Sequence, residues 1–468
     1  MFKNDTILQE VDKMFTYVKA KNFKSLKDIE FNLNKTKTKT NQFISIYGEN
    51  GSGKTNIVEL FKLLQQSIMS RATDIAMNKM PKEFWKIQEE MSDQLPTEIR
   101  QIFQLSFNLK EYRMLDEEEA TEIEYGFKIN NKDGFYYIKF DDEIIEEKLY
   151  YMAGKQRAYL FQINKENNKI TKNLNKNIFI NEKYNEELID GIDKYWGKYT
   201  FLSLLSFETI EKNKDYIDNN ISKNIIEVID RVWLMTVHVD KGALKIMPDG
   251  FVKVRKLNNI QKGIVKKDKL PEIKKYENVL NIFFTQAYAD IKEVKYEINE
   301  KEDRIHYELY FNKMIGGQIK SIPSRLESDG TRRILNQFDT IIGSLLGETV
   351  IIDEIDNGIH DVLMKNIIMS IKDEITGQLI ITTHNTLLLE VLPKENIYIL
   401  STDRNGNKTI NSIKEYGIKI QKNNNARDLY FKGVFGGIPT TNYIDFEEIK
   451  YALEDSENNE ENADGEET

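Results

Sequence analysis

The sequence GENGSGKT, residues 48–55, decides the fold class of this chain. It matches the phosphate-loop pattern GxxxxGK(S/T) at every specified position. The apolar run FISIY at residues 43–47 precedes it, and apolar residues follow at helical spacing over residues 57–64. Strand, glycine-rich loop and helix stand in the order that a phosphate site requires, because backbone N–H groups and the positive helix N-terminus then converge on the phosphates.

Each part of this loop has a defined task in binding a nucleoside triphosphate. The glycines let the backbone approach the phosphates, Lys54 reaches the β- and γ-phosphates, and Thr55 can coordinate Mg²⁺. A chance glycine-rich turn before a helix is the alternative, and the flanking strand and helix argue against it. The candidate nucleotide-binding residues here are Gly48, Asn50, Gly51, Ser52, Gly53, Lys54, Thr55 and Asn56.

A second candidate element is TVIIDE at residues 349–354, an apolar strand that ends in two carboxylates. Asp353 would hold Mg²⁺ directly or through water, as metal-dependent phosphoryl transfer requires. Glu354 would polarise the attacking water as a general base. Strands often end in acidic turn residues, so this pattern gains its meaning from the phosphate loop upstream.

A third candidate is His384, which ends the buried strand LIITT at residues 379–383. A neutral imidazole at the end of a strand could hydrogen-bond the γ-phosphate or the attacking water. A loop histidine without a partner is the alternative. The position of His384 about 30 residues after Asp353 favours a catalytic role.

The fourth candidate is the segment ESDGT at residues 327–331, which opens a predicted helix. A serine and a glycine at a helix N-terminus can bind an anion, but they also form an ordinary helix cap. The residues alone leave both interpretations open for Ser328 and Gly330.

The bulk composition excludes several classes of protein. The 468 residues include no Cys, which excludes disulfides, thiolate metal sites and cysteine nucleophiles. No apolar run approaches the roughly 18–20 residues of a membrane span. The first residues, MFKNDTILQE, also lack the apolar stretch of a signal peptide. We therefore expect a folded cytoplasmic protein without a membrane partner.

The formal net charge of −10 is concentrated at the C-terminal end. Residues 443–468 hold 11 acidic residues and one Lys, which leaves 65 basic and 65 acidic residues in the rest of the chain. A segment this polar, with charges that repel one another, is predicted to be disordered and to keep the protein solvated. Alternatively, it regulates a basic surface of a partner.

The pattern along the chain predicts an α/β fold with an added lobe. Alternating segments between residues 100 and 165 predict antiparallel hairpins, with Asp133-Gly134 near a turn, and Asn405-Gly406 predicts a later tight hairpin. Strand and helix alternation in the second half predicts a mostly parallel sheet. The expected segments are the first half of a nucleotide-binding head with a β subdomain at 15–170, an inserted helical lobe at 171–285, the second half of the head at 286–442, and the acidic tail at 443–468.

Five motifs together resemble a known superfamily. In order and spacing, NFKSLKDIEF, GENGSGKT, ESDGTRR, VIIDEID and ITTH are similar to the ATPase heads of the RecF, SMC and OLD branch of the ABC superfamily. ESDGT in place of LSGGQ, the continuation DEIDNGIH and the late RDLYFKGVFGGIP most resemble the AbiLi-type ATPases of bacterial antiphage systems, relatives of AriA of PARIS and PtuA of Septu. The likeness covers most of residues 15–440. It implies an ABC-type P-loop head, with a mixed sheet flanked by helices and an antiparallel β subdomain.

The resemblance also implies a nucleotide site shared by two copies of the chain. ATP and Mg²⁺ would lie between the heads of a homodimer or a higher homo-oligomer. Ser328, Asp329 and Gly330 of one copy would complete the γ-phosphate site of the other, and Asp356 would lie at the interface as part of the D-loop. Asp329 departs from the family by replacing the second signature glycine, and Asp361 by standing where many relatives have proline. The Q-loop glutamine stays open among Gln104, Gln156 and Gln162.

Three functions remain in competition. The first is an ATP-driven sensor or regulator in antiphage defence by abortive infection, which controls a separately encoded effector such as a nuclease or a toxin, with DNA or a phage protein as a possible ligand. The second is a RecF-like or SMC-like repair ATPase that acts directly on DNA. The third is a scaffold that binds ATP without hydrolysing it. The DNA hypothesis depends on lysines that could contact phosphates, although a solvated loop is their other interpretation: Lys262, Lys266, Lys267, Lys269, Lys274 and Lys275.

Overall fold

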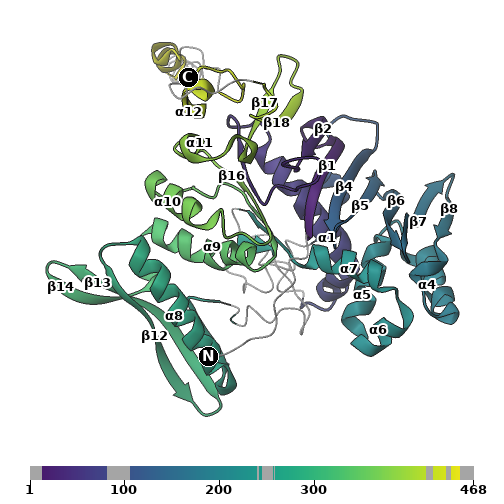
Figure 1. Cartoon of the computed structure of the whole chain (residues 1–468), viewed down its shortest axis with the longest axis horizontal. Coiled ribbons are helices and arrows are strands. Elements are labelled where there is room, and N and C mark those ends of the chain that lie inside the picture. Colours follow the sequence, from purple (N-terminus) through teal and green to yellow (C-terminus); the bar gives the residue numbers. More distant parts are fainter. Residues whose placement is uncertain are drawn as a thin grey trace, which may run out of the picture. The chain divides into compact units, whose positions relative to one another are not determined.

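The computed structural model describes residues 13–81, 106–239, 242–244, 257, 259–417, 425–438 and 444–453 (Figure 1). The chain divides into two compact units, Met1–Gly437 and Ile438–Thr468. In the second unit residues 446–453 are helical, which corrects the expectation of disorder over that part of 443–468. Apolar Phe446, Ile449 and Leu453 recur there at helical spacing within the acidic sequence. The rest of that expectation, residues 454–468, lies outside the described residues.

A seven-stranded, mostly parallel sheet forms the centre of the first unit and carries the phosphate loop. β3 lies next to β16, and β15 lies on the far side of β16. Five strands run parallel, and the two edge strands are antiparallel to their neighbours. This confirms the predicted α/β class. From edge to edge the strands are β10 (Gly242–Leu244), β9 (Met235–Val239), β15 (Thr349–Ile352), β16 (Gln378–Thr382), β3 (Phe43–Tyr47), β17 (Ile397–Thr402) and β18 (Lys408–Ser412).

A seven-stranded antiparallel sheet confirms the hairpins predicted from alternation. Its order is β2-β1-β4-β5-β6-β7-β8. The turn between β4 and β5 is Asn130-Asn131, with φ of 52° and 58°, so Asp133 and Gly134 lie inside β5 instead of in the turn. A Cβ at Gly134 would lie 2.6 Å from the ring of Phe127, which explains the glycine there. The strands are β1 (Lys13–Phe23), β2 (Leu26–Asn32), β4 (Thr121–Ile129), β5 (Lys132–Phe140), β6 (Ile144–Ala153), β7 (Gln156–Glu166) and β8 (Lys169–Leu174).

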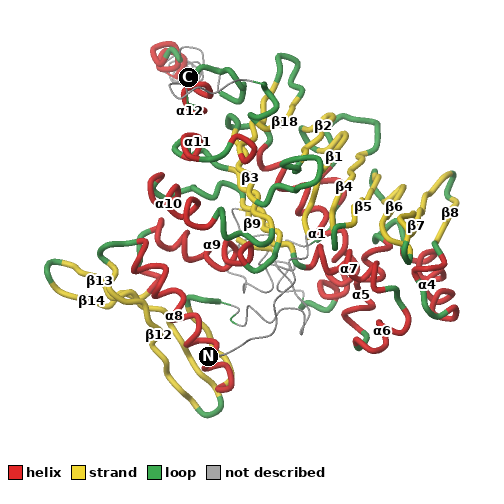
Figure 2. Tube along the Cα trace, viewed as in Figure 1, coloured by secondary structure: helices red, strands yellow, loops and turns green. Residues whose placement is uncertain are grey.

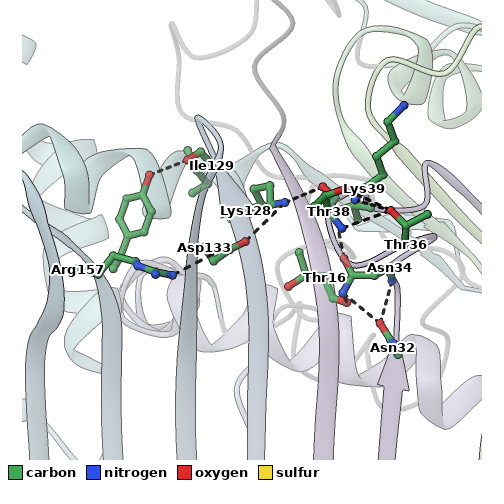
Figure 3. A network of polar contacts seen from close by, with 12 residues as sticks. Thr16, Asn32, Asn34, Thr36, Thr38, Lys39, Lys128, Ile129, Asp133 and Arg157 are labelled. Carbon is green, nitrogen blue, oxygen red and sulfur yellow. Dashed lines mark hydrogen bonds and ion pairs between the residues drawn. The ribbon is translucent and has the colours of Figure 1, made fainter.

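Polar contacts hold the connection from β2 to β3 against the antiparallel sheet (Figure 3). Asn34 donates through Nδ2 to the carbonyl of Thr16 at 3.1 Å. Lys128 of β4 donates to the carbonyl of Thr38 at 3.1 Å and lies 3.7 Å from Asp133. These contacts fix the segment that enters β3 and therefore the start of the phosphate loop.

Helix α1 (Lys54–Asn78) contacts both sheets. Tyr125 of β4 donates its hydroxyl hydrogen to the carbonyl of Leu60 at 2.6 Å, and Gln65 donates to the carbonyl of Met235 in β9 at 3.1 Å. Its apolar residues belong to one hydrophobic core with strands of both sheets. The helix that begins at the phosphate loop is thereby fixed on both sides.

The range 171–285 does not form a single helical lobe. The described part of this range includes α4 (Glu182–Tyr195), α5 (Phe201–Glu211), α6 (Lys214–Asn220) and α7 (Lys223–Trp233), and Figure 2 shows these helices close to the antiparallel sheet. It also includes most of α8 (Leu270–Ala287), which packs on a different sheet. The same range also contributes β9 and β10 to the parallel sheet. Pairing of β9 with β15 joins residues more than 100 positions apart, which local periodicity cannot reveal.

A third sheet packs on α8 (Leu270–Ala287). It contains β11 (Lys262–Lys266), β13 (Arg304–Ile315) and β12 (Ile291–Lys301), and β14 (Gln318–Pro323) pairs with β13. Phe284 of α8 contacts Phe311, and Phe283 contacts Phe338 of α9 (Asp329–Leu345), with ring centroids 5.1 and 5.0 Å apart. The remaining helices are α10 (Asp361–Ile371), α11 (Leu388–Val391) and α12 (Ala426–Phe431).

A buried carboxylate links the antiparallel sheet to the helices. Glu147 of β6 is fully buried and accepts hydrogen bonds from the Tyr136 hydroxyl, the Trp196 indole and the N–H groups of Phe201 and Leu202. Burial raises the pKa of Glu147 to about 7, although the four donors oppose the shift. The two N–H groups open α5, so this carboxylate also caps that helix.

This raised pKa predicts a pH-dependent stability. The folded chain holds the Glu147 proton more tightly than the unfolded chain, so the stabilisation is fully present below pH 4.5 and is lost as the pH rises through 7. We expect the unfolding free energy of the wild type, minus that of Glu147→Gln, to be about 2–3 kcal/mol larger at pH 5 than at pH 8. Urea titrations at the two pH values measure this difference. A difference that is constant, or that grows toward pH 8, contradicts the assignment.

Candidate nucleotide site

The phosphate loop joins β3 to α1 as the sequence predicts. Gly51 and Gly53 have φ of 78° and 104°, a region that L side chains rarely adopt. Lys54 is 6 % exposed, and its ammonium donates to the carbonyls of Gly48 and Glu49 at 2.8 and 3.1 Å. The loop therefore closes around its own lysine, and a phosphate would give that ammonium a charged partner in place of two carbonyls.

The loop environment fits an anionic ligand. Ser52 is 2 % exposed, and its hydroxyl has no hydrogen-bond partner among the residues that the structure describes. Burial lowers the pKa of Lys54, against the charges of Glu354, Asp353, Asp356 and Glu49. A buried, desolvated cation is stabilised by a nearby negative charge. Asn50 and Thr55 are exposed at the loop, and Asn56 lies in the first turn of α1.

Thr382, a residue that the motif analysis did not select, contacts both acidic residues that follow β15. The Thr382 hydroxyl donates to Asp353 Oδ1 at 2.6 Å and accepts the N–H of Glu354 at 2.7 Å. Glu354 has φ of 45°, a strained conformation for a residue with a side chain. A hydroxyl at the end of a strand next to β15 is the signal that could have identified this residue.

His384 and Asp356 are brought together by the same strand ends. The His384 N–H donates to both carboxylate oxygens of Asp356 at 3.0 and 3.3 Å, and its side chain is exposed. The charges of Asp353, Glu354 and Asp356 all raise the pKa of Lys54, against the larger effect of burial. The structure thus gathers the lysine, the three acidic residues and the histidine loop at one end of the parallel sheet.

The predicted signature residues lie at the N-terminus of α9. The Ser328 hydroxyl accepts the N–H of Thr331 at 3.2 Å, which is the ordinary capping role. Asp329 pairs with Arg332, and a Cβ at Gly330 would lie 2.9 Å from the carbonyl of Gly358. Among the described residues, no hydrogen bond or ion pair joins residues 328–330 to the phosphate loop of the same chain.

The candidate Q-loop glutamines remain without support. Gln156 and Gln162 lie on β7 of the antiparallel sheet, where Gln162 accepts a hydrogen bond from Asn173 at 3.4 Å. Gln104 lies outside the described residues.

The late glycine pair supports the start of the phosphate loop. A Cβ at Gly437 would lie 3.5 Å from the Cα of Gly48 and 2.7 Å from Ile399. The Tyr430 hydroxyl donates to the carbonyl of Gly437 at 2.8 Å and so fixes this close approach. Gly437, in the segment RDLYFKGVFGGIP that the sequence analysis used only as a family resemblance, therefore packs beside the loop.

The described part of the chain contains no group of three or more side chains that could hold a metal. It also contains no helix long and apolar enough to cross a bilayer. Three or more His, Asp or Glu side chains do not meet there in a way that could hold a metal. The described helices are also too short or too polar to span a membrane.

Comparisons with known proteins found a family model and solved structures that are similar to this chain. The family model described as "AAA domain, putative AbiEii toxin, Type IV TA system" matches residues 43–390, from β3 to α11. An SMC head solved with the C-winged helix domain of ScpA is 16 % identical, with a TM-score of 0.40, and the match covers 86 % of this chain and all of that one. The SMC head domain from Thermotoga maritima is 12 % identical, with a TM-score of 0.34, over 85 % of this chain and 98 % of that one.

No curated protein matches the chain in sequence. The family match covers well over half of the chain and includes the phosphate loop, both carboxylates and the histidine strand. The chain therefore belongs to the family described as "AAA domain, putative AbiEii toxin, Type IV TA system" and is an ATPase domain of the AAA type.

Proposed function

We propose that this chain binds Mg-ATP between two copies of itself and hydrolyses it to switch the state of the pair. The observation that carries the proposal is the meeting of Lys54 with Asp353 and Glu354 at one end of the parallel sheet. Phosphoryl transfer to water requires two carboxylates and a cation that binds the phosphates. One carboxylate holds the metal and the other orients the water.

Each residue has a role set by its position. Lys54 would turn from the loop carbonyls to the β- and γ-phosphates. Thr55 and Asp353 would hold Mg²⁺, which neutralises charge on the phosphates when it is bound. Glu354 would accept a proton from the attacking water. Thr382 would position the Asp353 carboxylate and the Glu354 backbone through the contacts that it makes. His384, whose side chain is exposed, would contact the γ-phosphate or the water.

The need for a second copy follows from the position of α9. Ser328 and Asp329 are exposed, and they make no hydrogen bond or ion pair with the described loop residues of their own chain. An exposed helix N-terminus can serve the site of another copy, where its partial positive charge favours the γ-phosphate. Asp356 would lie at the same interface.

We further propose that the pair is the sensor or regulator of a bacterial antiphage system. The description of the family names a toxin of a toxin–antitoxin system. The motifs ESDGT, DEIDNGIH and RDLYFKGVFGGIP resemble those of the AbiLi-type ATPases. The effector, a nuclease or a toxin, would be a separate protein whose activity depends on the nucleotide state of this chain.

Two measurements on the unaltered chain test the proposal. ATP hydrolysis is expected to require Mg²⁺ and to cease in EDTA. Sedimentation is expected to show that Mg-ATP shifts the chain toward a dimer or a higher homo-oligomer when hydrolysis is blocked. Binding without hydrolysis would favour the scaffold, and neither binding nor hydrolysis would refute the proposal. Co-purification with the product of a neighbouring gene addresses the effector.

The six lysines between residues 262 and 275 give little support to the hypothesis of direct action on DNA. Three of the six form ion pairs with acidic neighbours: Lys267 with Glu300, Lys269 with Glu272 and Lys274 with Glu277. Such pairing reduces the positive charge available to phosphates. Duplex binding with a steep dependence on salt would restore this alternative.

A further inference from the structure

A second lysine reaches the phosphate loop from the other end of the sequence. Lys408 is the first residue of β18, and its ammonium donates to the Ser25 hydroxyl at 2.5 Å and to the carbonyl of Gly51 at 3.4 Å. A Cβ at Gly53 would lie 3.1 Å from the same nitrogen. The ammonium therefore lies directly against the backbone that would hold the phosphates.

This ammonium has no counter-charge in contact. No ion pair joins Lys408 to a carboxylate among the described residues, and both of its hydrogen-bond acceptors are neutral. Burial lowers the pKa of Lys408, against the charge of Glu49. A partly desolvated cation with neutral partners favours binding of an anion.

The carboxylates that act on Lys408 differ in part from those that act on Lys54. The charges of Asp353, Glu354 and Asp356 act on Lys54, whereas Glu49 is the carboxylate that acts on Lys408 among the described residues. The γ-phosphate must lie near Glu354, because the attacking water does. Lys408 lies instead against Gly51 and Gly53 of the loop, where a cation can meet the phosphates that remain after hydrolysis.

Asn56 completes a polar cluster at this position. Its side-chain amide donates to the Ser25 hydroxyl at 2.6 Å, so Ser25 contacts both Asn56 and Lys408. Three elements thus contribute one residue each: the β1–β2 turn, the first turn of α1 and β18. Because the loop backbone cradles the α- and β-phosphates, the cluster lies beside that part of the nucleotide.

We propose that Lys408, positioned by Ser25 and Asn56, is a second phosphate-binding residue that contacts the α- and β-phosphates and therefore holds ADP as well as ATP. The proposal rests on the proposed nucleotide site. It gives the β17–β18 hairpin a direct part in binding, and the hairpin would sense whether any nucleotide is present.

The experiment compares the affinities of Lys408→Ala and the wild type for Mg-ATP and Mg-ADP by calorimetry. Loss of a charge-assisted contact is expected to weaken the binding of both nucleotides alike, by about 10- to 100-fold. Lys408→Arg should retain most of the affinity. Lys414→Ala is the matched control, because Lys414 donates instead to the carbonyl of Lys35.

Unchanged affinity for both nucleotides in Lys408→Ala overturns the inference. A loss confined to ATP also overturns it, because it would place Lys408 at the γ-phosphate. If Lys408→Ala fails to fold, Ser25→Ala is measured in its place and should weaken ATP and ADP equally. A wild type that binds neither nucleotide refutes the proposed function itself, so the two failures are distinguishable.

Discussion

Replacement of Glu354 by Gln is expected to slow ATP hydrolysis by about 10²- to 10⁴-fold and to leave Mg-ATP binding in place. The amide keeps the shape of the side chain but cannot accept the proton of the attacking water. The backbone N–H of Glu354 donates to Thr382 at 2.7 Å, and its carboxylate accepts one long hydrogen bond from Asn357 at 3.4 Å. The amide of Gln can accept the same bond, so the fold should tolerate the change. Phosphate release under saturating Mg-ATP measures the effect.

Glu374→Gln is the matched control for this prediction. Glu374 is exposed beyond α10 and has no place in the site, so hydrolysis should remain at the wild-type rate. A Glu354→Gln variant that hydrolyses ATP within about threefold of the wild type would show that another group serves as the base. Blocked hydrolysis with retained binding would also make this variant the reagent of choice for trapping the dimer.

Replacement of Lys54 by Ala is expected to lower the affinity for Mg-ATP by about 100-fold or more. The ammonium would contact two phosphates, and each hydrogen bond to a charged group contributes about 1.5–3 kcal/mol. Without ligand, Lys54 donates only to the loop carbonyls of Gly48 and Glu49 among the described residues. The melting temperature of the free protein should therefore change little, whereas its rise on adding Mg-ATP should disappear.

The control for Lys54 is Lys79→Ala, at the exposed C-terminal end of the same helix. This variant should keep the full thermal response to Mg-ATP. Undiminished stabilisation of Lys54→Ala by Mg-ATP would mean that the nucleotide binds elsewhere on the chain.

The local parts of the site were predictable because each is a short pattern with its own physics. FISIY became β3, and both carboxylates follow β15 as expected. Long-range pairing was not predictable. β3 lies between β16 and β17, which follow it by more than 300 residues, and no local pattern encodes that contact.

Residues that act through a distant partner were missed for the same reason. Thr382 and Lys408 are unremarkable in sequence, and each gains its role from a neighbouring strand or loop. The late hairpin was placed correctly, but its turn differs. Gly406 alone has a positive φ there, and Asp403 accepts the N–H groups of Asn405 and Asn407, so a longer loop replaces the tight Asn-Gly turn.

Titration calorimetry of Mg-ATP into the wild-type chain tests the central claim most directly. The account predicts saturable heat at one nucleotide per chain, dependent on Mg²⁺ and lost in Lys54→Ala. Absence of saturable heat, or binding that survives the loss of the Lys54 ammonium, would contradict it.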